Sequence, residues 1–216
     1  RTYFNYNLRL EPTNVCVASC LFCSFARLKP TDAAAYTMSL EQAWDKLRRR
    51  AHQPLTELHI VNGLNPDLPF GYYTELLRGF KRIRPGIHLK CFTAVEIAYF
   101  ADLYGMSDEQ VLRQLKDAGL DSLPGGGAEI FAERVRKKIC HDKCDADRWL
   151  SIHRLAHRLG MACQRRVVAG AGGEAQDAPG KLVVADRGAA AQLDQALAAV
   201  GAEPGQHAAA ALEAPG

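Results

Sequence analysis

The stretch Cys16-Val-Ala-Ser-Cys20-Leu-Phe-Cys23 places three cysteines within eight residues, directly after the alternating segment Asn7–Glu11, which predicts a β-strand. Thiolates are the usual ligands of iron–sulfur clusters, and three of them can hold one face of a cubane [4Fe–4S] cluster. One iron then stays free to bind another molecule, and an open metal position is typical of a catalytic site. A structural zinc site would instead need four ligands, usually in paired C-x2-C spacing. The alternative is three buried cysteines without a metal.

Composition narrows the class of protein. The chain has 216 residues, of which 48% are hydrophobic and 24% charged, and its formal net charge is +3. This is the composition of a globular protein without the basic signature of a nucleic-acid binder. No apolar run is long enough to cross a membrane, and no signal-peptide pattern opens the chain. Seven cysteines in such a chain favour metal ligation over disulfides and predict a cytoplasmic protein.

Strand-like and helix-like segments alternate as far as Met161. This alternation predicts a mostly parallel sheet with right-handed crossovers, as in a (β/α) barrel. Because a complete barrel needs roughly 250 residues, the expected fold is a partial TIM-type barrel, about its first half. The predicted strands are Asn7–Glu11, Glu57–Val61, His88–Thr93 and Leu120–Leu123, and the predicted helices are Ser39–Arg50, Tyr72–Ile83, Ser107–Ala118, Glu129–Ile139 and Ala146–Leu159.

The composition changes near Met161. All aromatic residues lie at or before Trp149, and 17 of the 51 residues from Arg166 to Gly216 are alanine. A segment of this kind buries little apolar area. The sequence therefore predicts two parts, a partial barrel over 1–161 and an irregular Ala/Gly-rich tail over 162–216.

Three further places carry unusual residues where a predicted strand ends, which is where parallel α/β folds build their sites. Asn62-Gly63 offers backbone and side-chain amides, although an ordinary turn is an alternative. Glu96 offers a carboxylate for an amine or for hydroxyl groups, unless it is a solvated surface residue. Gly125–Gly127 exposes amides before a helix that starts at Glu129, and a flexible loop is the alternative.

Other candidates have weaker support. Cys140 and Cys144, with His141, could suggest a second metal site, but no partner pair is visible nearby in the sequence. We interpret the basic run 134–138 as the solvated side of its helix.

With these residues in view, the chain resembles the radical S-adenosylmethionine superfamily and, within it, the aminofutalosine synthases. The resemblance rests on the three-cysteine motif and on Glu11-Pro-Thr-Asn-Val-Cys16, His59-Ile-Val-Asn-Gly-Leu, Phe92-Thr-Ala-Val-Glu-Ile, Leu123-Pro-Gly-Gly-Gly-Ala-Glu-Ile-Phe, Glu133-Arg-Val-Arg-Lys-Lys-Ile-Cys140 and Arg148-Trp-Leu-Ser-Ile-His153. It covers about Tyr3 to Met161. In this family Asn65 would be expected to be histidine. The tail does not share the resemblance, and its sequence suggests a truncated copy or a shift of reading frame.

The resemblance implies a mechanism and a set of residues. Cys16, Cys20 and Cys23 would hold a [4Fe–4S] cluster whose fourth iron binds S-adenosylmethionine. The resulting 5′-deoxyadenosyl radical would add to 3-[(1-carboxyvinyl)oxy]benzoate and yield aminofutalosine, on the futalosine route to menaquinone. Phe22, Asn62, Gly63 and Glu96 would contact the cofactor, and Gly125, Gly126, Gly127 and Glu129 would line the substrate region. A flavodoxin or ferredoxin would supply the electron.

Three alternatives stay open. The first is the sister dehypoxanthine-futalosine cyclase, which abstracts a hydrogen instead. The second is a non-catalytic iron–sulfur module, which would need a fourth protein ligand that the sequence does not show. The third is an inactive product of a damaged gene.

Overall fold

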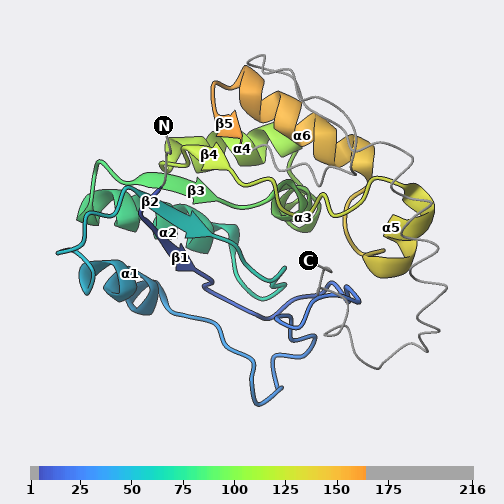
Figure 1. Ribbon diagram of the computed structural model, residues 1–216, viewed down its shortest axis with the longest axis horizontal. Coiled ribbons are helices and arrows are strands. Elements are labelled where there is room, and N and C mark those ends of the chain that lie inside the picture. Colours follow the sequence, from blue (N-terminus) through green and yellow to red (C-terminus); the bar gives the residue numbers. More distant parts are fainter. Residues whose placement is uncertain (1–4, 164–216) are drawn as a thin grey trace, which may run out of the picture.

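The computed structural model describes residues 5–163, and the predicted tail lies outside this range except for its first two residues. Five parallel strands form one sheet in the order β1-β2-β3-β4-β5 (Figure 1). They are β1 (Asn7–Leu10), β2 (Glu57–Ile60), β3 (His88–Cys91), β4 (Ser122–Leu123) and β5 (Ala162–Cys163). Each strand pairs with the next one in the chain, so every connection crosses over in the same sense, as in the first part of a (β/α) barrel. The predicted parallel sheet is confirmed.

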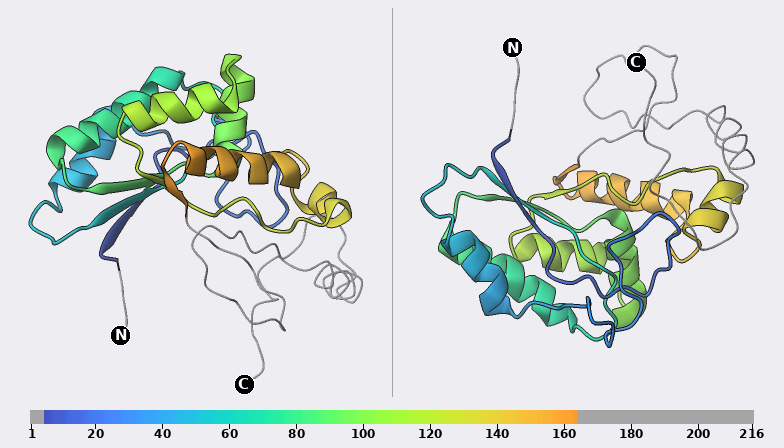
Figure 2. Two further views of the ribbon diagram at one scale, coloured as in Figure 1. Left: turned by 90° about the horizontal axis from the view of Figure 1, so that it is seen from above. Right: turned by 60° about the horizontal axis from the view of Figure 1, so that its bottom comes forward.

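Helices cover one face of this sheet (Figure 2). α1 (Leu40–Arg48) packs on α2 (Phe70–Ile83), α2 on α4 (Asp108–Asp117), and α4 on α6 (Ala146–Arg158). Successive side chains of a strand point to opposite faces of the sheet. The apolar Leu58, Ile60 and Leu89 share the face that the helices cover, and all three are fully buried there. The opposite face carries a row of polar residues that lie side by side on neighbouring strands. In the register of the sheet, Arg9 is opposite His59, His59 is opposite Lys90, and Lys90 is opposite Ser122. No helix of the described residues could span a membrane.

The predicted caps of the helices are confirmed. Ser39 and Gln42 form a capping box at the start of α1, and Ser107 and Gln110 form one at the start of α4. The Asp145 side chain accepts a hydrogen bond from the Arg148 amide at the start of α6. In each case the cap satisfies a helix N–H group that has no partner within the helix.

Two elements differ from the sequence prediction. The chain does not stay extended to Thr93, because Phe92 turns with φ 58° and α3 (Ala94–Tyr104) follows at once. This helix was missed because residues on all its sides are buried, so its apolar residues show little helical periodicity. At the other end, Ala162 and Cys163 pair with Ser122 and Leu123. The sheet therefore continues two residues past the boundary expected after Met161, and the rest of the predicted tail lies outside the described residues.

Candidate functional site

The three-cysteine motif forms a closed loop after β1. The Cys16 amide donates to the Arg27 carbonyl at 2.9 Å, and the Cys23 amide donates to the Cys20 carbonyl at 3.1 Å. The Ala18 amide donates to Cys16 Sγ at 3.4 Å. The exposure of the three thiol residues rises along the loop, since Cys16 is buried, Cys20 half-buried and Cys23 exposed. The loop thus presents free thiols from the interior outward.

These thiols suit a cluster better than a single ion. Within residues 5–163, no three His, Cys, Asp or Glu side chains are close enough together to hold one metal ion. A cubane cluster binds each cysteine through a different iron, so its ligands need not converge on one point. Burial raises the pKa of Cys20 to about 11, Lys143 acts against this rise, and Cys16, Cys23 and Cys140 add to it. Three free thiols on one loop are the donor type that a [4Fe–4S] cluster requires.

Gly63 fixes this loop against the end of β2. Its amide donates to the Thr13 carbonyl at 2.9 Å, and a Cβ atom at this position would lie 2.2 Å from the Val15 carbonyl oxygen. Only glycine permits such an approach of two backbones. The chain that leads into Cys16 therefore lies directly against Gly63. Next to it, the buried Asn65 amide donates to Thr13 and Thr37 at 3.0 and 3.1 Å.

Asn62 and Glu96 meet at the ends of β2 and β3, as expected for neighbouring parallel strands. Glu96 Oε1 accepts from the Asn62 backbone amide at 3.1 Å and from Asn62 Nδ2 at 3.2 Å. Glu96 Oε2 accepts from the Thr93 amide at 2.7 Å and from its hydroxyl at 2.9 Å. Glu96 is 2% exposed, so the alternative of a solvated surface residue is excluded. Asn62 Oδ1 is buried and has no hydrogen-bond partner among the described residues.

The buried Glu96 carboxyl predicts a dependence of stability on pH. Burial raises its pKa from 4.5 to about 7 in the folded protein, against the opposite effect of the hydrogen bonds from Thr93 and Asn62. The stabilisation is therefore complete below about pH 4.5 and is lost as the pH rises through 7, when a carboxylate must stay buried. We expect the difference in unfolding free energy between the wild type and Glu96→Gln to fall by about 2 to 3 kcal/mol between pH 5 and pH 8.

Urea unfolding of both proteins across this range measures the difference and cancels groups that the two proteins share. A difference that does not change with pH would show that Glu96 is not held neutral by burial.

The glycine loop packs against the start of α3. A Cβ atom on Gly126 would lie 3.1 Å from Thr93 Cγ2, and one on Gly127, which has φ +81°, would lie 2.5 Å from Val95 Cγ2. The loop therefore lies beside the Asn62–Glu96 pair, and it is held there rather than free. The alternative of a flexible loop finds no support in these contacts.

Arg136 fixes the glycine loop through hydrogen bonds to its backbone. Its guanidinium donates to the carbonyls of Gly127, Ala128, Ile130 and Cys144 at 2.6–3.3 Å. Arg136 is 4% exposed, so the interpretation of the basic run as a solvated helix side is wrong at this position. α5 (Glu133–Ile139) begins later than predicted, because the carbonyls of Gly127, Ala128 and Ile130 accept hydrogen bonds from Arg136 and Ala132 is extended.

The connection after α5 contacts the cysteine loop, which sequence reasoning missed. The Leu21 amide donates to the Ile139 carbonyl at 2.9 Å, and the Ser19 amide and hydroxyl both donate to Asp142 Oδ2 at 2.8 Å. Lys143 pairs with Glu129 Oε1 at 2.8 Å, and its ammonium lies 5.0 Å from the centroid of the Phe22 ring. Cys140, the residue after α5, is buried.

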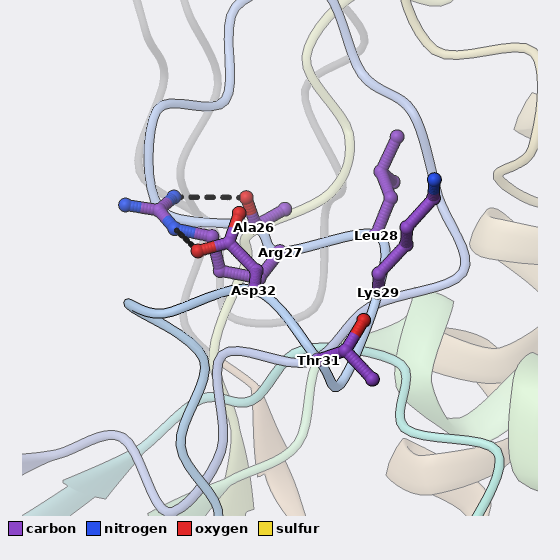
Figure 3. Close-up of a pocket in the computed structure, with 6 residues that line it drawn as sticks. All are labelled: Ala26, Arg27, Leu28, Lys29, Thr31 and Asp32. Atoms are coloured by element: carbon purple, nitrogen blue, oxygen red, sulfur yellow. Dashed lines mark hydrogen bonds and ion pairs between the residues drawn. The ribbon is translucent and has the colours of Figure 1, made fainter.

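Two cavities border the loop. One of about 240 Å³ lies between Leu64, α3 and the connection after α5, and its lining includes Tyr99, Lys143 and Cys144. The other, of about 540 Å³, is open and lies where the cysteine loop returns, between Ala26 and Asp32 (Figure 3). There Arg27 forms an ion pair with Asp32 at 3.7 Å, while its backbone pairs with Val15. The larger cavity is lined by one loop only, whereas the smaller one is lined by Leu64, by α3 and by the connection after α5.

A three-thiol loop at the carboxyl edge of a parallel β/α sheet defines a class of enzyme, and comparison with known proteins agrees. The sequence pattern of the radical SAM superfamily matches residues 10–177, and the chain belongs to this superfamily. Its members use a [4Fe–4S] cluster and S-adenosylmethionine.

Individual relatives show which enzymes of the superfamily the chain is similar to. Aminodeoxyfutalosine synthase of Streptomyces coelicolor is 50% identical over 159 residues, which cover 74% of this chain and 41% of that protein. The 5-amino-6-(D-ribitylamino)uracil–L-tyrosine 4-hydroxyphenyl transferase of Methanopyrus kandleri is 43% identical and covers 73% of this chain and 42% of its own length. The chain thus spans about two fifths of the length of these relatives.

Structural comparison agrees on the fold. The crystal structure of methylornithine synthase matches with a TM-score of 0.55 and 15% sequence identity, over 73% of this chain and 42% of that one. At this identity the likeness shows the fold alone, a parallel sheet with helices of the radical SAM kind.

Proposed function

We propose that this chain forms the cluster-binding part of a radical SAM transferase that adds the 5′-deoxyadenosyl group to 3-[(1-carboxyvinyl)oxy]benzoate and, after rearrangement and loss of a carboxylate, forms aminofutalosine. The observation that carries the proposal is the cysteine loop itself. Gly63, at the end of β2, holds the backbone of this loop, and the next residue toward the N-terminus, Asn62, is hydrogen-bonded to Glu96. The 50% identity to an aminodeoxyfutalosine synthase supports the choice of reaction within the superfamily.

Cys16, Cys20 and Cys23 would hold the cluster, which supplies the electron that cleaves the sulfonium of S-adenosylmethionine. Their different exposure leaves the outer side of the loop open to a ligand, while Cys16 anchors the inner side. The protein's part in such chemistry is to bind, to orient and to exclude competing reactions.

The Asn62–Glu96 pair would orient the amino-acid end of S-adenosylmethionine. Glu96 engages Asn62 Nδ2 and so fixes the amide with its oxygen free. A buried acceptor without a partner is costly unless a ligand donor meets it, and an ammonium group is such a donor. In this arrangement Glu96 acts through Asn62 rather than on the ligand directly.

The remaining predicted residues would line the nucleoside and the substrate. Phe22 is 43% exposed at the cysteine loop and offers an apolar face to the adenine. The loop Gly125–Gly127, fixed by Arg136, would border the substrate together with Glu129. A small acidic redox protein of the flavodoxin or ferredoxin kind would deliver the electron.

The test is product analysis after anaerobic cluster reconstitution. The chain is incubated with S-adenosylmethionine, dithionite and the enolpyruvyl benzoate, and products are identified by mass spectrometry. Aminofutalosine, with methionine in equal amount, is the expected result. Free 5′-deoxyadenosine without an adduct would indicate hydrogen abstraction, as in the sister cyclase, and a cluster without any cleavage would indicate a non-catalytic iron–sulfur module.

A further inference from the structure

We propose that Lys143 is a positioning residue that supplies a fixed positive charge to the cluster site and thereby raises the reduction potential of the cluster. This inference rests on the proposed function, because it needs a cluster on Cys16, Cys20 and Cys23. It adds a residue that the cysteine motif does not contain and that lies more than a hundred positions further along the chain.

The segment that carries Lys143 is attached directly to the cysteine loop. Ile139 accepts the Leu21 amide at 2.9 Å, and Asp142 accepts both the amide and the hydroxyl of Ser19 at 2.8 Å. These contacts involve the residues on either side of Cys20. The segment 139–144 therefore cannot move away from the loop without breaking three hydrogen bonds.

Lys143 itself is held in one place. Its side chain is 13% exposed, and its ammonium contacts both the Glu129 carboxylate at 2.8 Å and the face of Phe22 at 5.0 Å. Phe22 lies between Cys20 and Cys23 in the sequence, so a cation over its ring lies at the cysteine loop. Attraction to an aromatic face strengthens when the cation is withdrawn from water.

The partner of Lys143 argues for more than a surface ion pair. Glu129 has φ 48°, a left-handed conformation that a residue with a side chain adopts only where other contacts maintain it. Its carboxylate is 33% exposed and comes from the glycine loop, so the pair joins the predicted cluster site to the predicted substrate region. An exposed pair of two mobile side chains would show neither feature.

A fixed charge at this position has a defined physical effect. The potential of an iron–sulfur cluster depends on the net charge around it and on its exposure to solvent. Reduction adds a negative charge to a centre that already carries three thiolates. A nearby cation that water does not screen fully favours the reduced state, and the Glu129 carboxylate offsets part of that effect.

The experiment compares Lys143→Met, Lys143→Arg and Glu129→Gln with the wild type. Each protein is reconstituted anaerobically, its iron and sulfide are counted, and the cluster is titrated with redox mediators while the reduced form is followed by EPR. Lys143→Met should lower the ratio of reduced to oxidised cluster at a given potential about tenfold, which is 59 mV for one electron. Lys143→Arg keeps the charge and should keep the wild-type potential.

Glu129→Gln separates charge from structure. It removes the negative partner and leaves the ammonium, so the potential should move upward, opposite to that of Lys143→Met. A loop that is merely loosened would shift both variants in the same direction, and this result would overturn the inference. An unchanged potential in Lys143→Met with a full cluster would also overturn it. A wild type that takes up no cluster would instead refute the proposed function, and the inference with it.

Discussion

Gly63→Ala is expected to lower the free energy of unfolding by on the order of 3 kcal/mol and to remove most of the bound cluster. The added methyl group would lie 2.2 Å from the Val15 carbonyl oxygen and 2.8 Å from its carbonyl carbon. These are backbone atoms that cannot rotate away, so the two loops must separate. Separation also breaks the hydrogen bond from Gly63 to Thr13 and moves the chain that leads into Cys16.

Gly71→Ala is the matched control for this substitution. A Cβ atom on Gly71 meets nothing within 4 Å, and the residue lies in the first turn of α2, where alanine is favoured over glycine. It should leave cluster content unchanged and stability equal or slightly higher. Thermal unfolding and iron analysis of both variants measure the effects. Equal behaviour of the two variants would contradict the close contact between the loops.

Replacing any one of Cys16, Cys20 or Cys23 by alanine should reduce the iron retained after reconstitution by at least about tenfold. Loss of one thiolate leaves one more iron without a protein ligand, and a cluster with two open irons is exposed to hydrolysis. The visible absorbance of the cluster and the iron content per chain measure the loss.

Cys91→Ala controls for the removal of a thiol as such. Cys91 is fully buried on β3 and belongs to the hydrophobic core. We expect a stability cost of about 1 kcal/mol from the small cavity and an unchanged cluster content. If the Cys91 variant lost the cluster as completely as the motif variants, or if a motif variant kept it, the assignment of the ligands would be refuted.

Much of the arrangement could be predicted because its causes are local. The spacing of the three cysteines is a property of eight consecutive residues, and the alternation of strands and helices follows from short periodic segments. Parallel strands end at one edge, which is why Asn62 and Glu96 could be expected near each other although 34 positions separate them. The capping residues of α1, α4 and α6 are also local signals.

What could not be predicted depends on contacts between distant segments. The sequence shows Arg136 as one of several basic residues, and only the fold shows that four carbonyls surround it. The sequence also gives no sign that Lys143 is special, because only the fold brings the connection after α5 to the cysteine loop. The sequence likewise does not show that the backbone at Val15 lies against Gly63, because the two residues are far apart in the chain.

The helix α3 and the short strand β5 could not be predicted from the sequence for a different reason. A periodic pattern of apolar residues identifies elements that have one solvent-exposed face, whereas α3 is buried around most of its surface. β5 has two described residues, which is too short for any pattern, and only its pairing with β4 defines it.

The central claim is that three thiolates hold a cluster whose fourth iron is open to S-adenosylmethionine. The most direct measurement is the EPR spectrum of the reduced, reconstituted chain recorded with and without S-adenosylmethionine. The account predicts the signal of a [4Fe–4S] cluster whose g values change when S-adenosylmethionine is added, because the ligand binds the open iron. A cluster signal that S-adenosylmethionine leaves unchanged would contradict the account, since it would mean that every iron already has a ligand that S-adenosylmethionine cannot displace.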